Sequence, residues 1–122
     1  MLKNLFLIVL TVIINTTGQF VIKTGVNKIG RISFTNEFVP TIYRALTNWV
    51  IISGFGIYFI SAILWITILS RTQLSWAFPI LSLSYVITVL ISPIFLNESF
   101  SVQRLIGTLV IVFGVYLISR TY

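Results

Sequence analysis

Three polar side chains within an apolar stretch near the start of the chain are the residues best suited to bind a ligand. Asn15, Gln19 and Lys23 recur every four residues, so on a helix they lie along one face. Two amides followed by a cation suit a polar group that carries negative charge. Because polar side chains that face lipid are costly, the three together predict a cavity on this face. Taken singly, Asn15 could instead bond a neighbouring helix and Lys23 could extend to the membrane surface.

The segments that must position these residues are transmembrane helices. Of the 122 residues, 57% are hydrophobic and 8% are charged, and the mean hydropathy is +1.07. This composition cannot supply the polar shell of a soluble domain, and it predicts an all-α integral membrane protein. The first apolar segment lacks a small-residue cleavage site, so we expect it to span the membrane rather than to be a signal peptide. We expect one domain, residues 1–122, with four transmembrane helices at about residues 4–22, 49–70, 74–96 and 102–119.

The ionisable residues restrict the chemistry. The sequence has no cysteine and no histidine, and its only acids are Glu37 and Glu98. These counts exclude disulfides, thiolate and imidazole metal ligands and histidine acid–base catalysis. We therefore expect no enzyme activity, no metal and no cofactor. The net charge of +6 comes from bases near the ends of the apolar segments, where they anchor helices at the membrane surface, so nucleic acid is not an expected partner.

The distribution of basic residues leaves the membrane orientation open. Three bases fall on one predicted side of the membrane and five on the other. This is a weak bias under the positive-inside rule, so insertion in both orientations remains possible.

The connection at residues 24–48 predicts an irregular segment with one short helix. Gly25, Asn27 and Gly30 interrupt regular structure at its start. A helix at the membrane surface is expected from about Val39, with Pro40 in its first turn. A loose surface loop is the alternative.

The stretch from Trp76 to Tyr116 is interpreted as an antiparallel helix hairpin around which the rest of the chain is built. Pro79 is expected to kink its first helix, because proline removes a backbone hydrogen bond. In the second helix, Gly107 and Gly114 lie seven residues apart on one face. This face predicts a packing seam, either with another helix of the chain or with a second copy.

The same hairpin carries a resemblance to a known superfamily. An early proline, a glutamate in the turn and a glycine-spaced final helix (Pro79, Glu98, Gly107, Gly114) resemble the last two helices of the drug/metabolite transporter superfamily. Its four-helix members are small multidrug resistance-like or EamA-like proteins. The segment AFPILSL, residues 77–83, and the Gly-Gln followed by a lysine at residues 18–23 are similar to the subunits of the 4-amino-4-deoxy-L-arabinose-phosphoundecaprenol flippase. The similarity covers most of the chain.

This resemblance implies a multi-pass protein of the bacterial inner membrane that moves an undecaprenyl-phosphate-linked sugar. Lysine and arginine can hold the phosphate while the lipid tail stays in the bilayer. We therefore expect Asn15 and Gln19 to line a path for the sugar. The residues expected to bind phosphate are Lys23, Lys28, Arg31 and Arg44, and the facing wall is expected to consist of Tyr58, Trp65, Ser82 and Tyr85. The expected assembly is a homo- or heterodimer that packs partly through Gly107 and Gly114.

Two other functions remain possible from the sequence. One is a small multidrug resistance-type exporter, but such exporters carry a glutamate in the middle of their first helix, and the first helix here has no acid. The other is a non-transporting partner of a membrane glycosyltransferase.

Overall fold

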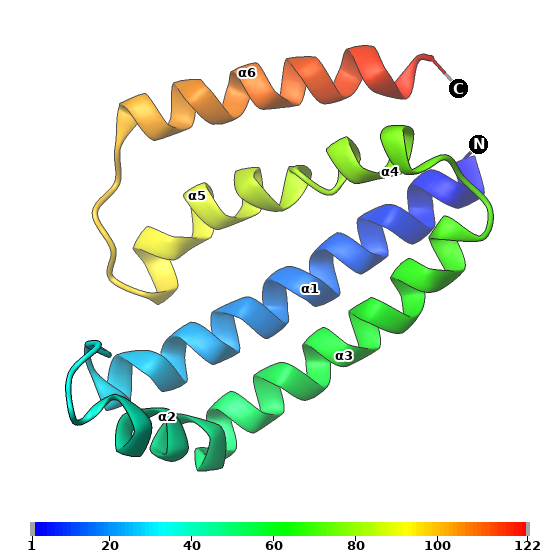
Figure 1. Ribbon diagram of the computed structural model, residues 1–122. Helices are drawn as coiled ribbons and strands as arrows, with labels where there is room; N and C mark the ends of the chain where they lie inside the picture. Colours follow the sequence, from blue (N-terminus) through cyan, green and yellow to red (C-terminus); the bar gives the residue numbers. More distant parts are fainter. Residues whose placement is uncertain (1, 122) are drawn as a thin grey trace.

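Every regular element in residues 2–121, the part of the chain that the computed structural model describes, is an α-helix (Figure 1). In chain order the helices are α1 (Leu2–Ile29), α2 (Phe38–Thr47), α3 (Trp49–Leu69), α4 (Leu74–Ile80), α5 (Leu83–Phe95) and α6 (Val102–Ser119). Four spans are long and apolar enough to cross a membrane: α1, α3, the combined α4 and α5, and α6. The predicted all-α membrane fold is therefore confirmed.

Helix α1 is longer than its apolar run. The sequence prediction ended it at about Ile22, where polar residues and Gly25 begin, but the helix continues to Ile29. Gly25 does not break the helix. It is buried against α3, where an added Cβ would lie 2.6 Å from Ile51 Cγ1. This close packing against α3 stabilises the last turns of α1. A prediction based on the length of the apolar run does not include such a contact, so it ended the helix too early.

The short helix expected in the connection is α2. It begins at Phe38 and has Pro40 in its first turn, where a missing N–H is tolerated. It lies across the ends of α1 and α3 (Figure 1). The next helix, α3, begins directly afterwards, because the Asn48 side-chain oxygen accepts hydrogen bonds from the Val50 and Ile51 N–H groups at 2.9 and 3.3 Å.

The closest helix pair is α1 with α3, not the hairpin of α5 and α6. The hairpin is antiparallel as expected (Figure 1), but it lies beside α1 and does not organise the bundle. At the crossing of α1 and α3, an added Cβ on Gly18 would lie 3.0 Å from the Gly54 carbonyl oxygen. Small residues permit such close backbone approach. The expected seam at Gly107 and Gly114 makes no such contact within the described residues, since a Cβ there would meet nothing within 4 Å.

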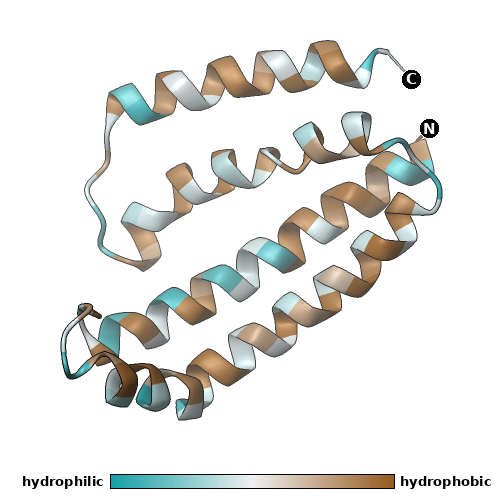
Figure 2. Ribbon diagram, in the orientation of Figure 1, coloured by the Kyte–Doolittle hydropathy of each residue, from teal (hydrophilic) through white to brown (hydrophobic). Residues whose placement is uncertain are grey.

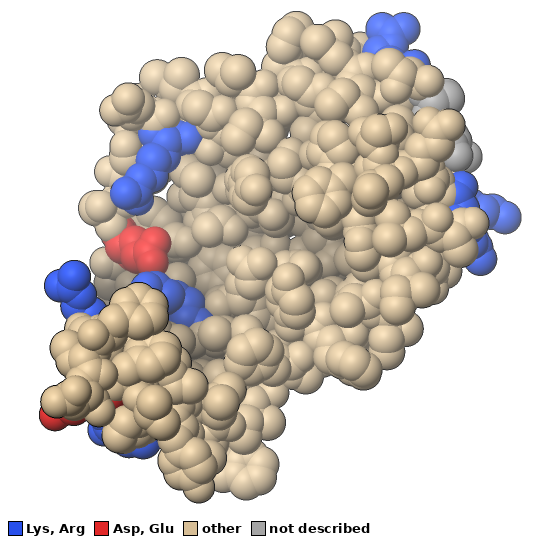
Figure 3. Space-filling model, in the orientation of Figure 1, with Lys and Arg blue, Asp and Glu red and all other residues tan. Residues whose placement is uncertain are grey.

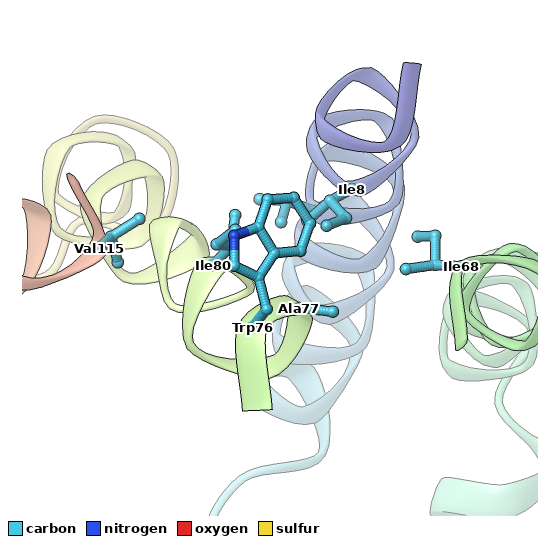
Figure 4. Close-up of a cluster of buried hydrophobic side chains, with 7 residues drawn as sticks. Ile8, Ile68, Trp76, Ala77, Ile80 and Val115 are labelled. Carbon is cyan, nitrogen blue, oxygen red and sulfur yellow. The ribbon is translucent and has the colours of Figure 1, made fainter. Parts of the chain in front are cut away.

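The apolar core lies at the end of the bundle that holds both chain ends (Figures 1 and 4). Ile8 of α1 packs there against α4, through Trp76, Ala77 and Ile80 (Figure 4). Helices α3 and α6 complete the cluster with Ile68 and Val115. The first half of α1 is thus held by packing. Its second half carries most of the hydrophilic positions along this helix (Figure 2).

Candidate functional site

The interruption between α4 and α5 opens the bundle next to the polar half of α1. Pro79 has no N–H to donate to the carbonyl of Ser75, and the residues that follow form tighter bonds to the third residue back. The Leu81 N–H donates to the Phe78 carbonyl at 3.1 Å, and the Ser82 N–H donates to the Pro79 carbonyl at 3.0 Å. The Ser82 hydroxyl donates to the same Pro79 carbonyl. The predicted disruption near Pro79 is therefore a tight, 3₁₀-like turn at Leu81 and Ser82, which keep right-handed helical dihedrals and divide one span into α4 and α5.

A cavity of about 380 Å³ lies at this break, and we call it the polar cavity. Helix α1 contributes Asn15 and Gln19, α3 contributes Tyr58, and the start of α5 contributes Tyr85. The full lining is Val12, Asn15, Gln19, Tyr58, Phe78, Pro79, Leu81, Ser82, Ser84 and Tyr85. Its volume falls in the range of about 300–1,000 Å³ that is usual for small-molecule sites.

The structure brings together five of the seven side chains expected to bind substrate: Asn15, Gln19, Tyr58, Ser82 and Tyr85. The two amides are ordered by a bond from Gln19 Nε2 to Asn15 Oδ1 at 2.9 Å. Trp65 lies outside this lining. Its ring packs edge-on against Phe78 with centroids 6.1 Å apart, so it supports a wall residue instead of forming the wall.

Lys23, the sixth expected residue, lines an adjoining space of about 210 Å³, which we call the lysine hollow. Gln19 lines both spaces. The other lining residues come from α1, α5 and the following loop, and they are Phe20, Thr88, Ser92, Leu96 and Glu98. The hollow therefore contains one basic and one acidic side chain, and no ion pair between them is found among the described residues.

The other expected phosphate-binding residues do not join Lys23. Lys28 lies in the last turn of α1, Arg31 follows that helix in the connection, and Arg44 lies in the last turn of α2. All three are exposed, and none lines the polar cavity or the lysine hollow. They lie on the side of the bundle where α1 ends. On the face in Figure 3, basic side chains gather at two opposite ends and acidic ones at only one.

A third space, the apolar groove, runs along α1 and α5 with a volume of about 690 Å³. Its lining is Ile13, Thr16, Thr17, Phe20, Val21, Thr24, Ile87, Ile91, Phe95 and Leu96. The Thr17 and Thr24 hydroxyls donate to carbonyls of their own helix at 2.8 and 2.9 Å, so they add little polarity. Phe20 and Leu96 line both the groove and the lysine hollow.

Several lining residues were not selected from the sequence. Ser84, Thr88 and Ser92 are polar positions within the apolar sequence of α5, and a search for such positions along that helix finds them. From the sequence, Glu98 is recognised as the glutamate of the turn before the last helix and not as a site residue. Asn97 before it has φ 54°, in the left-handed region that asparagine adopts more readily than most residues. No sequence pattern indicates that this turn brings Glu98 to the same hollow as Lys23.

Four apolar spans, three of which line a ligand-sized cavity with polar residues, indicate a multi-pass membrane protein of the transporter class. The model of the EamA-like transporter family matches residues 38–120. The chain belongs to this family. The match begins at α2, so it does not include the polar face of α1. The place of that face in the site depends on the lining of the polar cavity and the lysine hollow.

Curated relatives extend the similarity across α1. A probable 4-amino-4-deoxy-L-arabinose-phosphoundecaprenol flippase subunit ArnF from Serratia proteamaculans is 34% identical over 113 residues, 89% of this chain and 86% of the relative. The subunit of the same name from Photorhabdus laumondii is 28% identical, covering 91% and 92%. A probable subunit ArnE of such a flippase, from Aeromonas salmonicida, is 29% identical, covering 94% and 96%. No solved structure matches the chain.

Proposed function

We propose that this chain is a subunit of a flippase that moves an undecaprenyl-phosphate-linked sugar across the bacterial inner membrane. The proposal depends on one observation: the polar cavity, the lysine hollow and the apolar groove adjoin in that order. Gln19 connects the first two spaces, and Phe20 and Leu96 connect the last two. A glycosyl phosphoprenol carries groups that match these three spaces in the same order: a sugar, then a phosphate, then an isoprenoid tail.

The headgroup would use the polar part of this arrangement. Lys23 supplies the charge for the phosphate, since an ammonium is a strong donor to phosphate oxygens. Asn15 and Gln19 offer amide donors and acceptors to sugar hydroxyls along a path into the polar cavity. The exposed bases Lys28 and Arg44, on the side where α1 ends, would attract the phosphate before it reaches Lys23.

The tail would occupy the apolar groove. Its walls are aliphatic and aromatic side chains with three threonines, of which Thr17 and Thr24 are bonded to their own helix and Thr16 is buried without a hydrogen-bond partner among residues 2–121. Burying apolar surface there does not require breaking any polar contact. An apolar groove of this size suits a lipid tail better than the small cations that multidrug exporters carry. In addition, α1 has no acidic residue that could hold such a cation.

A second subunit would complete the site. In the single chain Tyr58 and Tyr85 are 41% and 56% exposed, so the polar cavity opens sideways toward the bilayer. A polar cavity open to lipid is unfavourable, and a homo- or heterodimer would close it. The open glycine face of α6, at Gly107 and Gly114, is available for such a contact.

Transport in membrane vesicles from the native cells tests the proposal with any natural partner present. The rate at which a radiolabelled sugar-phosphoprenol crosses the membrane would be compared for wild type and Lys23→Met. Loss of a charged hydrogen bond of about 1.5–3 kcal/mol predicts a fall of about tenfold or more. Lys3→Met is the matched control, because Lys3 is an exposed lysine at the other end of the same helix and lines none of the three spaces, and this variant should transport nearly as wild type does.

Equal transport by a well-folded Lys23→Met protein would contradict the phosphate site. Absence of transport in wild-type vesicles would contradict the flippase function itself. Export of quaternary ammonium compounds in place of the lipid would assign the chain to the multidrug exporters.

A further inference from the structure

The lysine hollow by itself carries no net charge. Lys23 contributes one positive charge and Glu98 contributes one negative charge, and no ion pair joins them within residues 2–121. A space that holds one cation and one acid has little electrostatic preference for an anion such as a phosphodiester. The phosphate site of the proposed flippase therefore needs a second cation, and the exposed bases expected from the sequence do not line the hollow.

Arg104, in the first turn of α6, is a base that lies close to the lysine hollow. It lines a neighbouring space of about 170 Å³, which we call the loop hollow, and Ser92 and Glu98 line both hollows. Figure 3 shows an acidic side chain between basic ones at this end of the bundle. The Arg104 side chain forms no ion pair or hydrogen bond within the described part of the chain. Two bases and one acid leave the joined hollows with one net positive charge.

The hydroxyl of Ser92 lies where the two hollows meet and is not used by the fold. Ser92 is only 5% exposed, yet its hydroxyl makes no hydrogen bond to any of residues 2–121. The nearby Thr88 hydroxyl, in contrast, donates to the Ser84 carbonyl of its own helix at 2.8 Å. Buried polar groups are nearly always hydrogen-bonded, so the Ser92 hydroxyl is available as a donor to a ligand in these spaces.

We propose that Arg104 is the second cation of the phosphate site, and that the Ser92 hydroxyl donates to the phosphate between Arg104 and Lys23. This inference rests on the proposed function and adds two binding residues to it. A phosphodiester has two non-bridging oxygens and one negative charge, which suit an arginine, a lysine and one net positive charge. Glu98 lowers the total positive charge, which limits how tightly the phosphate is held and so permits its release.

A lipid without a sugar tests this site separately from transport. The protein is purified in mild detergent from native membranes with any natural partner. Equilibrium binding is measured for the methyl phosphodiester of a radiolabelled polyprenol and for the uncharged polyprenol. Wild type should prefer the phosphodiester. Arg104→Met should weaken phosphodiester binding about tenfold or more, and Ser92→Ala should weaken it by about fivefold, because each loses a hydrogen bond to a charged group. Neither variant should change polyprenol binding.

Arg120→Met is the matched control, because Arg120 lies just beyond the other end of α6 and lines neither hollow, and it should bind both lipids as wild type does. Glu98→Gln should bind the phosphodiester more tightly than wild type. Combining Glu98→Gln with Arg104→Met should return the affinity toward that of wild type, because Lys23 then supplies the one net positive charge.

Wild-type affinity of Arg104→Met for the phosphodiester, an equal loss for both lipids, or no recovery in the double variant would each show that Arg104 does not bind the phosphate. Unchanged phosphodiester binding by Ser92→Ala would remove Ser92 from the site. If wild type binds the phosphodiester no better than polyprenol, the phosphate recognition of the proposed flippase has failed instead. The two failures are therefore distinguishable.

Discussion

Replacing Gly54 with alanine tests whether the contact between α1 and α3 holds the site in place. An added Cβ would lie 2.5 Å from Ile22 Cγ1, 2.9 Å from the Gly18 carbonyl oxygen and 2.9 Å from the Ile22 nitrogen. Two of these atoms belong to the backbone and cannot rotate away, so the two helices must move apart. Overpacking of a close-packed contact typically costs about 1–3 kcal/mol.

Gly56 provides the control, because it lies on the same helix and an added Cβ there meets nothing within 4 Å. Alanine in place of glycine inside a helix gains up to about 1 kcal/mol in helix propensity. Both variants share this gain, so it cancels in their difference. We expect Gly54→Ala to be less stable than Gly56→Ala by about 1–3 kcal/mol.

Unfolding in mixed detergent micelles by titration with dodecyl sulfate, followed by far-UV circular dichroism, gives the two free energies. Gly18→Ala should also be destabilised, because its Cβ would lie 3.0 and 3.1 Å from backbone atoms of Gly54 and Tyr58. Equal stability of Gly54→Ala and Gly56→Ala would show that α1 and α3 are not packed this closely. The position of Tyr58 across the polar cavity would then lose its physical basis.

Three further substitutions test the site and its surroundings. Pro79→Ala restores a backbone N–H and should join α4 to α5, which would slow hydrogen exchange at Ser82 and reduce transport; unchanged exchange would mean that the break does not depend on the proline. Thr16→Val removes a buried hydroxyl that has no hydrogen-bond partner among residues 2–121. The stability in the dodecyl sulfate titration should therefore stay equal or rise by about 1 kcal/mol, and a clear loss would indicate a partner for this hydroxyl. Gln19→Leu removes the 2.9 Å bond to Asn15 and should reduce transport of the sugar lipid without lowering the yield of folded protein, whereas wild-type transport would exclude the amides from the path.

Features that depend on spacing along one helix could be predicted from the sequence. The four-residue recurrence of Asn15 and Gln19 indicated one face, and both line the polar cavity. The missing N–H of Pro79 is a local property of the sequence, and it predicts a disrupted helix. The regular helix α4 ends one residue later, at Ile80. The surface helix α2 followed in the same way from Pro40 and the polar residues before it.

Features that depend on contacts between helices could not be predicted in this way. Gly107 and Gly114 have the regular spacing of a seam, yet the close contact uses Gly18 and Gly54, which lie on different helices. A single sequence does not show which glycines face each other. Trp65 was placed in the wall because it is aromatic, but its ring packs behind Phe78. Aromatic residues suit both positions, and only the rotation of α3 decides between them.

The division of α1 into two halves explains why the site forms where it does. The first half is fixed by Ile8 and Val12, which pack in the core against α4. The second half is fixed on one side only, by Gly18 and Gly25 against α3. After the irregular turn that follows Pro79, α5 makes only limited contact with the other side of this half, and the space beside Gln19 stays open. A substitution that fills this space from α5 should therefore block transport without unfolding the bundle, because the close contacts of this half of α1, at Gly18 and Gly25, are with α3.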